Sequence, residues 1–364
     1  MWTKTTATAV LGIDLPIVQG PFGGGNSSLE LTAAVSSSGA LGSFGAVGLR
    51  PAEIRELVRE LGLRTDKPFN VNLWVPLAGD DARTIEAEQL KRSLARIRPF
   101  LDELALDEPE LTTGPAFAEQ VEAILEACPP VWSFVMGIPD REMLSAARRR
   151  GIKTVGTATS VEEAVAIAEA GADAVVASGS DAGGHRGSFL RPADASLIGT
   201  FALVPQVARA VGIPTIAAGG IADGRGIPAA LALGAGAAQI GSAFLVTPES
   251  GAPPAHKAAL TSANARFTRL TRAFTGRLAR GLDNRLLRAL EAQPADILPF
   301  PAQHQLTLPL RKAAGRLARS DLMSLWAGQN TAGLRSLPAA ELIARLVREV
   351  EQVLRSDGLR ATEP

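Results

Sequence analysis

Short apolar runs alternate with amphipathic segments along most of the chain. Most of these runs are rich in Val, Ile and Ala and lack strict alternation, which is typical of strands buried on both faces of a sheet. Each is followed by a glycine-rich or polar turn and then by a helical stretch. We expect strands at PIVQG (16–20), ALGSFG (40–45), PFNVNLWV (68–75), VWSFVM (131–136), IKTVGT (152–157), ADAVVAS (172–178), IPTIAAGG (213–220) and AAQIGS (237–242).

The segments between these runs carry helix signals. PAEIRELVRELG (51–62) opens with proline and closes with glycine, and SVEEAVAIAEAG (160–171) places Ser160 and Glu163 as a capping box. Eight strand–helix repeats predict an α/β fold, a TIM (β/α)₈ barrel with a parallel sheet. The alternative is an open doubly wound sheet. That fold favours a GxGxxG fingerprint after its first strand, and GPFGGGNSS offers no clean version.

Two regions of the chain are not accounted for by a minimal barrel. The stretch 76–130 is too long for one crossover, and its charged run at 84–104 predicts an inserted helix. After about residue 247 the strand signal stops, and residues 264–293 and 341–356 have an arginine-rich, helical pattern. We therefore expect a barrel over 1–247 and a helical C-terminal subdomain over 248–364 that packs near the barrel mouth.

Composition excludes several classes of partner. The chain has 37 Lys and Arg against 37 Asp and Glu, and this zero net charge disfavours nucleic acids and anionic membranes as partners. One cysteine, Cys128, makes no internal disulfide, and no Cys/His cluster has zinc-like spacing. The sequence shows no convincing signal peptide and no apolar stretch of membrane-spanning length. We expect a cytoplasmic protein that binds no metal.

The loops after the last two expected strands suggest an anion site. In a barrel, functional residues gather at the carboxyl ends of the strands, and glycines after strands seven and eight that lead into helices form the usual phosphate site. Backbone N–H groups there can point together at one phosphate. We therefore predict phosphate binding at Gly219, Gly220, Gly241 and Ser242.

The loop after the sixth expected strand holds one of only three histidines in the chain. SGSDAGGHRG (178–187) places His185 after two glycines, at the rim where the phosphate is expected. An imidazole can accept a proton there or, when protonated, hold an anion. We predict that His185 is catalytic. His256 and His304 lie outside the strand ends and are interpreted as structural, although His304 in FPAQHQL can approach the mouth.

These motifs resemble a known family. DAGGHRG, NVNLW, IPTIAAGGIADGRG and AAQIGSAF look like the flavin-dependent nitronate monooxygenases, formerly called 2-nitropropane dioxygenases. PIVQGPFGGG and SSGALGSFGA are similar to the first two strands of that family, and FTGRLARGLDNR and DLMSLWAGQ are similar to its tail. The resemblance covers nearly the whole chain.

The resemblance implies an FMN bound non-covalently at the barrel mouth, with His185 as the active-site histidine. The chain differs from the family pattern at Phe22, usually Met, and at Ser178, usually Gln, and it has no tyrosine to line a substrate pocket. The residues implied to contact the cofactor are Gly20, Pro21, Phe22, Gly23, Asn72, Ser178, Gly183, Gly219, Gly220, Gln239, Ile240, Gly241 and Ser242.

The reaction implied is oxidation of an alkyl nitronate, such as propionate 3-nitronate, by O₂ to a carbonyl compound and nitrite. Two other interpretations share the barrel: an FMN- and NAD(P)H-dependent enoyl-thioester or quinone reductase, and an FMN-binding carrier without turnover. The arginine-rich tail either covers the active-site mouth or makes a homodimer contact, and both interpretations stay open.

Overall fold

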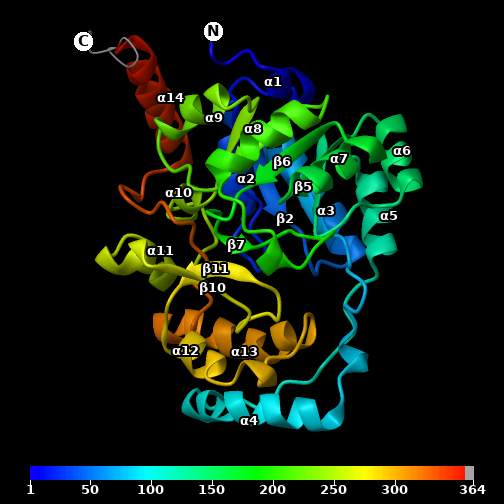
Figure 1. Ribbon diagram of the computed structural model, residues 1–364, viewed down its shortest axis with the longest axis vertical. Coiled ribbons are helices and arrows are strands. Elements are labelled where there is room, and N and C mark those ends of the chain that lie inside the picture. The colour runs from blue at the N-terminus through cyan, green and yellow to red at the C-terminus, as the bar shows by residue number, and fades with distance from the viewer. Residues whose placement is uncertain (357–364) are drawn as a thin grey trace.

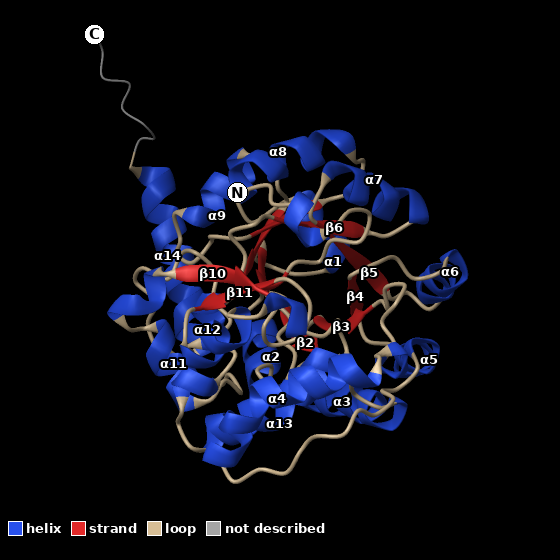
Figure 2. Ribbon diagram, turned by 60° about the horizontal axis from the view of Figure 1, so that its bottom comes forward, coloured by secondary structure: helices blue, strands red, loops and turns tan. Residues whose placement is uncertain are grey.

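The computed structural model describes residues 1–356 and shows a barrel of parallel strands surrounded by helices (Figure 2). The strands follow one another around the barrel in chain order, and a parallel bridge between Val18 and Leu41 closes the ring. The predicted (β/α)₈ barrel is thus confirmed, and the open sheet is excluded. The barrel strands are β1 (Ile17–Gln19), β2 (Gly42–Gly45), β3 (Phe69–Trp74), β4 (Val131–Val135), β5 (Lys153–Ala158), β6 (Ala174–Ser178), β8 (Thr215–Ala218) and β9 (Ala237–Ile240).

Helices cover the outside of this ring. The C-terminal helix α14 (Ala339–Arg355) packs against α2 and α9, so the chain returns to the barrel at its end (Figure 1). None of the described helices combines the length and apolar character that a membrane span requires. The barrel helices are α1 (Thr6–Leu11), α2 (Leu29–Ser37), α3 (Pro51–Arg64), α5 (Phe117–Ala127), α6 (Arg141–Arg149), α7 (Val161–Ala170), α8 (Thr200–Ala210), α9 (Gly226–Ala232) and α10 (Ser242–Leu245).

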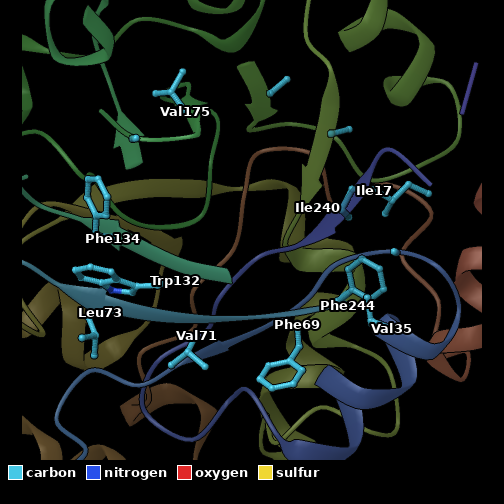
Figure 3. Close-up of a cluster of buried hydrophobic side chains, with 14 of the residues drawn as sticks. Ile17, Val35, Phe69, Val71, Leu73, Trp132, Phe134, Val175, Ile240 and Phe244 are labelled. Atoms are coloured by element: carbon cyan, nitrogen blue, oxygen red, sulfur yellow. The ribbon is translucent and has the colours of Figure 1, made fainter. Parts of the chain in front are cut away.

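Strand alternation decides which side chains face the barrel interior. On β3, Phe69, Val71 and Leu73 belong to the apolar layer between strands and helices (Figure 3). Successive side chains of a strand point to opposite faces, so Asn72 and Trp74 face the interior. Trp74 is the last residue of β3, at the mouth of the barrel.

A second lobe lies below the barrel in Figure 1 and has an apolar cluster of its own. The predicted inserted helix is confirmed as α4 (Ala87–Glu103), which packs against α12 and α13 of this lobe. Residues 357–364 of the predicted subdomain lie outside the described residues. The other helices of the lobe are α11 (Pro254–Leu260), α12 (Arg285–Glu291) and α13 (Ala302–Arg316). Short 3₁₀ turns lie at η1 (Ala82–Thr84), η2 (Ala193–Ala195, in the barrel loop before α8), η3 (Ala263–Arg266), η4 (Pro294–Asp296) and η5 (Ser320–Leu322).

The expected helix over 264–293 is wrong for most of its length. β10 (Thr268–Thr271) and β11 (Ala279–Leu282) form an antiparallel pair there, and α12 is the only α-helix within this described stretch. A third strand, β7 (Gly184–His185), comes from the loop after β6 and pairs with β11. Tertiary pairing thus overrides the helical pattern of the arginine-rich sequence, and the lobe is joined to the barrel mouth through a shared sheet.

Glu163 anchors the loop that carries β7. Its carboxylate is buried and accepts hydrogen bonds from the backbone N–H groups of Thr159 (2.7 Å), Phe189 (2.7 Å) and Leu190 (3.1 Å). The predicted capping box is only half formed. The Ser160 hydroxyl accepts the Glu163 N–H, but the Glu163 carboxylate holds the loop rather than the Ser160 backbone.

We therefore expect Glu163→Gln to lower the free energy of unfolding by roughly 2–4 kcal/mol, because an amide cannot accept from every buried donor. Glu162→Gln is the matched control on the same helix, since the Glu162 side chain is 60% exposed; its effect should stay below about 0.5 kcal/mol. Urea unfolding of the two variants measures the difference. Equal effects would show that Glu163 does not anchor the loop.

Candidate active site

The predicted site residues gather at the carboxyl ends of the barrel strands. Gly20, Pro21, Phe22 and Gly23 follow β1, Ser178 ends β6, and Gly183 and His185 lie in the next loop. Gly219 and Gly220 follow β8, and Gly241 and Ser242 follow β9. Because β8 and β9 are neighbours, with Ala218 opposite Gln239, these last two glycine pairs lie side by side.

The glycine turns after β8 and β9 leave backbone donors free. Within residues 1–356, the N–H groups of Gly219, Gly220 and Gly241 meet no protein acceptor. Gly219 and Gly220 have φ values of 119° and 69°, a region that glycine adopts readily and other residues rarely do. Gly241 precedes the first turn of α10, where further N–H groups lack intrahelical partners. These free N–H donors, gathered on two neighbouring turns, can bind an anion.

A segment that sequence reasoning did not assign to the site borders these turns. The Gly328 N–H donates to the Ser242 hydroxyl (3.0 Å), and the Asn330 side-chain amide donates to the Gly220 carbonyl (2.9 Å). A Cβ on Gly183 would lie 2.5 Å from the backbone of Gly328. Gly183 is therefore required for the close approach of this segment. The family-like WAGQ motif (326–329) was the only sequence signal for it.

Four other predicted contact residues occupy different positions relative to the mouth. The side-chain amide of Asn72 donates to the Ser133 hydroxyl (2.9 Å), below the mouth. The side chain of Ile240 is buried in the layer between strands and helices, which leaves only its backbone at the site, whereas Gln239 faces the barrel interior. The Phe22 ring lies against Gly20, where an added Cβ would be 3.4 Å from it.

His185 is held between the barrel and the second lobe. It pairs with Ala279 of β11, and its Nε2 lies 2.9 Å from the Thr275 hydroxyl, a residue that is almost fully buried. The imidazole packs edge-on against the Trp74 ring, 4.8 Å between centroids, and lies 5.2 Å from the Trp326 ring. Nδ1 has no hydrogen-bond partner within the described chain.

Two arginines and a second histidine lie around this histidine. Arg277, which is 8% exposed, stacks over Phe300 at 4.3 Å from the ring centroid and over Trp74 at 5.6 Å. One end of its guanidinium pairs with Asp80, and its Nη1 is buried with no partner in residues 1–356. His304 and Arg311 of α13 complete the group, with 3.2 Å between Nδ1 of the histidine and Nη2 of the arginine.

This environment disfavours a charged imidazole. Burial, followed by the positive charge of Arg277 and the proximity of His304 and Arg311, lowers the pKa of His185 well below its ordinary value. His185 is therefore neutral at pH 7. Of the two roles considered for it, proton acceptance fits this environment, and the positive charge that would hold an anion resides on the arginines.

Comparisons with known proteins show the family of this chain. The profile described as "Nitronate monooxygenase" matches residues 4–349. A Staphylococcus aureus (strain Newman) protein described as "Probable nitronate monooxygenase" is 36% identical over 357 residues, which is 97% of this chain and 99% of the relative. The chain belongs to the nitronate monooxygenase family. It is accordingly an oxidoreductase.

Two solved structures place this family member among related barrels. A nitroalkane oxidase from Streptomyces ansochromogenes is 40% identical with a TM-score of 0.88, and the match covers 96% of this chain and 99% of that one. FabK from Thermotoga maritima is 30% identical with a TM-score of 0.73, over 96% and 97% of the two chains. The first likeness is the stronger in both sequence and shape.

Three other residues, His256, Cys128 and Asp181, have structural or surface positions. His256 is buried and its Nε2 lies 3.0 Å from the Trp326 carbonyl, so it supports the ring that packs on His185, in agreement with a structural role. Cys128 is exposed and precedes β4, at the end of the barrel opposite the mouth. The Asp181 carboxylate accepts the N–H of Thr200 (2.7 Å) at the start of α8, as a capping residue would.

Acid should destabilise this member of the family through His256. Burial lowers its pKa to about 4, whereas an unfolded histidine titrates near 6.5. Because the folded pKa is the lower one, the unfolded state binds more protons between these values. Stability from this group is complete above pH 6.5 and declines as pH falls toward 4, by roughly 3 kcal/mol.

His256→Gln keeps an amide donor for the Trp326 carbonyl and removes the titration. We expect the free energy of unfolding of this variant to depend less steeply on pH between 6.5 and 4 than that of the wild type. Chemical denaturation at several pH values measures both slopes. Parallel pH curves would contradict the assignment.

Proposed function

We propose that this chain oxidises alkyl nitronates with O₂ to carbonyl compounds and nitrite, using FMN bound at the barrel mouth. The observation that carries the proposal is the buried, unpartnered Arg277 Nη1 beside a neutral histidine and three aromatic rings. A nitronate is a small, flat, delocalised anion, and a buried guanidinium with a free N–H edge pairs well with such a group.

The strand-end loops fit the phosphate of FMN. The free N–H groups of Gly219 and Gly220 follow β8, that of Gly241 lies at the start of α10, and donors gathered in this way stabilise an anion. A Cβ on Gly184 would meet nothing within 4 Å, and one on Gly241 would meet only Phe22, at 3.9 Å. Gly184 and Gly241 therefore leave space for a bound group beside the mouth. Gly219, Gly220, Gly241 and Ser242 would hold the phosphate end.

When bound, FMN supplies the electron transfer between the substrate anion and O₂. The protein's own residues perform binding, orientation and proton transfer. Arg277 pairs with the anionic end of the substrate, and Trp74 and Trp326 enclose it and exclude water. In that dry setting the charge of Arg277 acts strongly on the substrate.

His185, as a general base, would allow the protein to use neutral nitroalkanes as substrates as well as nitronates. Thr275 engages Nε2 and leaves Nδ1 without a protein partner among the described residues, so a neutral ring protonated at Nε2 presents a lone pair at Nδ1 as a general base. The carbon acid loses its proton to His185, and the nitronate that forms is the anion Arg277 holds. Nitronates themselves need no base.

A reductase is the second candidate, because FabK shares the barrel. The nitroalkane oxidase is nearer in both identity and shape, and the proposal follows that likeness. The third candidate, an FMN carrier without turnover, would not need a histidine placed to accept a proton, as His185 is. The absorbance spectrum of the flavin distinguishes the nitronate oxidase, the reductase and the carrier.

We expect the purified protein to show a flavin absorbance spectrum that anaerobic ethyl nitronate reduces and NADPH leaves unchanged. Rapid reduction by NADPH would favour the reductase, and a flavin inert to both reagents would favour the carrier. A colourless protein that cannot take up FMN would overturn the phosphate site itself.

His185→Asn should separate the two substrates. Loss of the base should lower kcat/KM for nitroethane by roughly 10²- to 10⁴-fold, whereas ethyl nitronate, already deprotonated, should lose about tenfold or less. Steady-state assays with each substrate measure this. Equal losses for both would remove proton abstraction from the role of His185.

The pH dependence should reflect the depressed pKa of His185. Its neutral, basic form predominates above that pKa, so kcat/KM for nitroethane should stay level as pH falls from 8 to 6.5 and decline only at more acidic pH. An acid limb with a pKa above 7 in the wild type would contradict a desolvated base.

A further inference from the structure

His304 is fixed in one tautomer by its neighbour on α13. Nη2 of Arg311 lies 3.2 Å from Nδ1 of His304. A guanidinium nitrogen only donates, so Nδ1 must accept and carry no proton. Burial, with the positive charges of Arg311 and Lys312, lowers the pKa of His304 to about 3. The ring is therefore neutral at pH 7, with its proton on Nε2.

Arg311 is held in place by several partners of its own. Its Nε donates to the Thr307 hydroxyl (3.1 Å), and its Nη1 donates to the Ser324 hydroxyl (3.0 Å). Nη2 also approaches the His304 carbonyl at 3.4 Å. No carboxylate pairs with it among the described residues. Because no carboxylate takes up its N–H groups, Arg311 can donate a hydrogen bond to Nδ1 of His304.

The opposite ring nitrogen of His304 has no protein partner in residues 1–356. The two nitrogens of an imidazole point in nearly opposite directions, so Nε2 points away from Arg311. His304 lies 6.0 Å from the Phe300 ring, which lies 5.8 Å from Trp74, the residue packed on His185. His304 also contributes to the depressed pKa of His185, so the two histidines share one environment.

We propose that His304 donates its Nε2–H to an oxygen of the bound nitro or nitronate group, with Arg311 as the positioning residue that sets the tautomer. The identity of this anion rests on the proposed function above. The two histidines then have opposite roles: His185 accepts a proton, and His304 donates a hydrogen bond as charge moves onto the oxygens. His304 becomes a second catalytic residue, which sequence reasoning interpreted as structural.

Selective ¹⁵N labelling of the three histidines tests the tautomer directly in the purified protein, with whatever cofactor it carries. Long-range ¹H–¹⁵N spectra should show an unprotonated Nδ1 and a protonated Nε2 on His304 at pH 7. Arg311→Met should give a mixture of tautomers, whereas Arg311→Lys keeps a donor and should preserve the Nε2–H form. A wild-type His304 protonated at Nδ1 would overturn the proposal.

Nitrite, an O–N–O anion, tests the contact without turnover. Adding nitrite to the wild type should shift the His304 Nε2 signal. His304→Gln places an amide near the Nε2 position and should bind nitrite within about threefold of the wild type, whereas His304→Leu should bind it about tenfold more weakly. An unperturbed His304 signal at saturating nitrite would overturn the contact.

Kinetics separate this inference from the proposed function. His304→Leu should lower kcat/KM for ethyl nitronate by about 10- to 100-fold, with Gln restoring most of the loss. Equal activity of the wild type and His304→Leu would overturn the catalytic role. If the wild type oxidises no nitronate, the proposed function fails, and the tautomer and nitrite titrations still decide whether His304 is an anion donor.

Discussion

The site depends on the pairing of β7 with β11. β7 is only two residues long, and alone it would be part of a mobile glycine-rich loop. Its antiparallel register with β11, with His185 opposite Ala279, ties the loop to a lobe almost a hundred residues further along the chain. The same lobe supplies Thr275, Arg277 and Trp326. A histidine from the barrel and side chains from the lobe are thus held together in one site.

This construction explains the electrostatics of the mouth. Arg277, His304 and Arg311 come from the lobe and surround an imidazole that the barrel presents, and Asp80 offsets only part of the charge of the two arginines. Removal of water makes unpaired positive charge costly, and an anionic ligand relieves that cost. The mouth is therefore prepared for an anion. Its histidines stay neutral because burial disfavours their charged form, and because charging them would add to the positive field of the arginines.

The sequence predicted the barrel well, because buried parallel strands leave uninterrupted Val- and Ala-rich runs and glycine turns that are visible in a single chain. It also located His185 and the glycine loops, since strand ends are where barrels place function. It missed β10 and β11. Their pattern, TRLT and ARGL, has no clear alternation, and only pairing with a distant loop makes these segments strands.

The same limitation applies to the lining of the site. Arg277 and Arg311 belong to the arginine-rich tail and were not assigned to the site, and His304 was interpreted as structural although it can approach the mouth. Nothing local shows that such a side chain will be buried by another part of the chain. Trp74 was within a predicted strand, but its contact with His185 depends on the lobe. Side chains that reach a site across a domain contact leave only weak signals in sequence, whereas residues on the barrel itself follow its periodicity.

A crystal structure of the protein soaked with nitrite tests the central claim most directly. The account predicts nitrite at the barrel mouth, with one oxygen within hydrogen-bond distance of Arg277 Nη1 and the other within reach of His304 Nε2. Nitrite bound elsewhere, with Arg277 Nη1 still unpartnered, would contradict the claim that the lobe and the barrel together build an anion site.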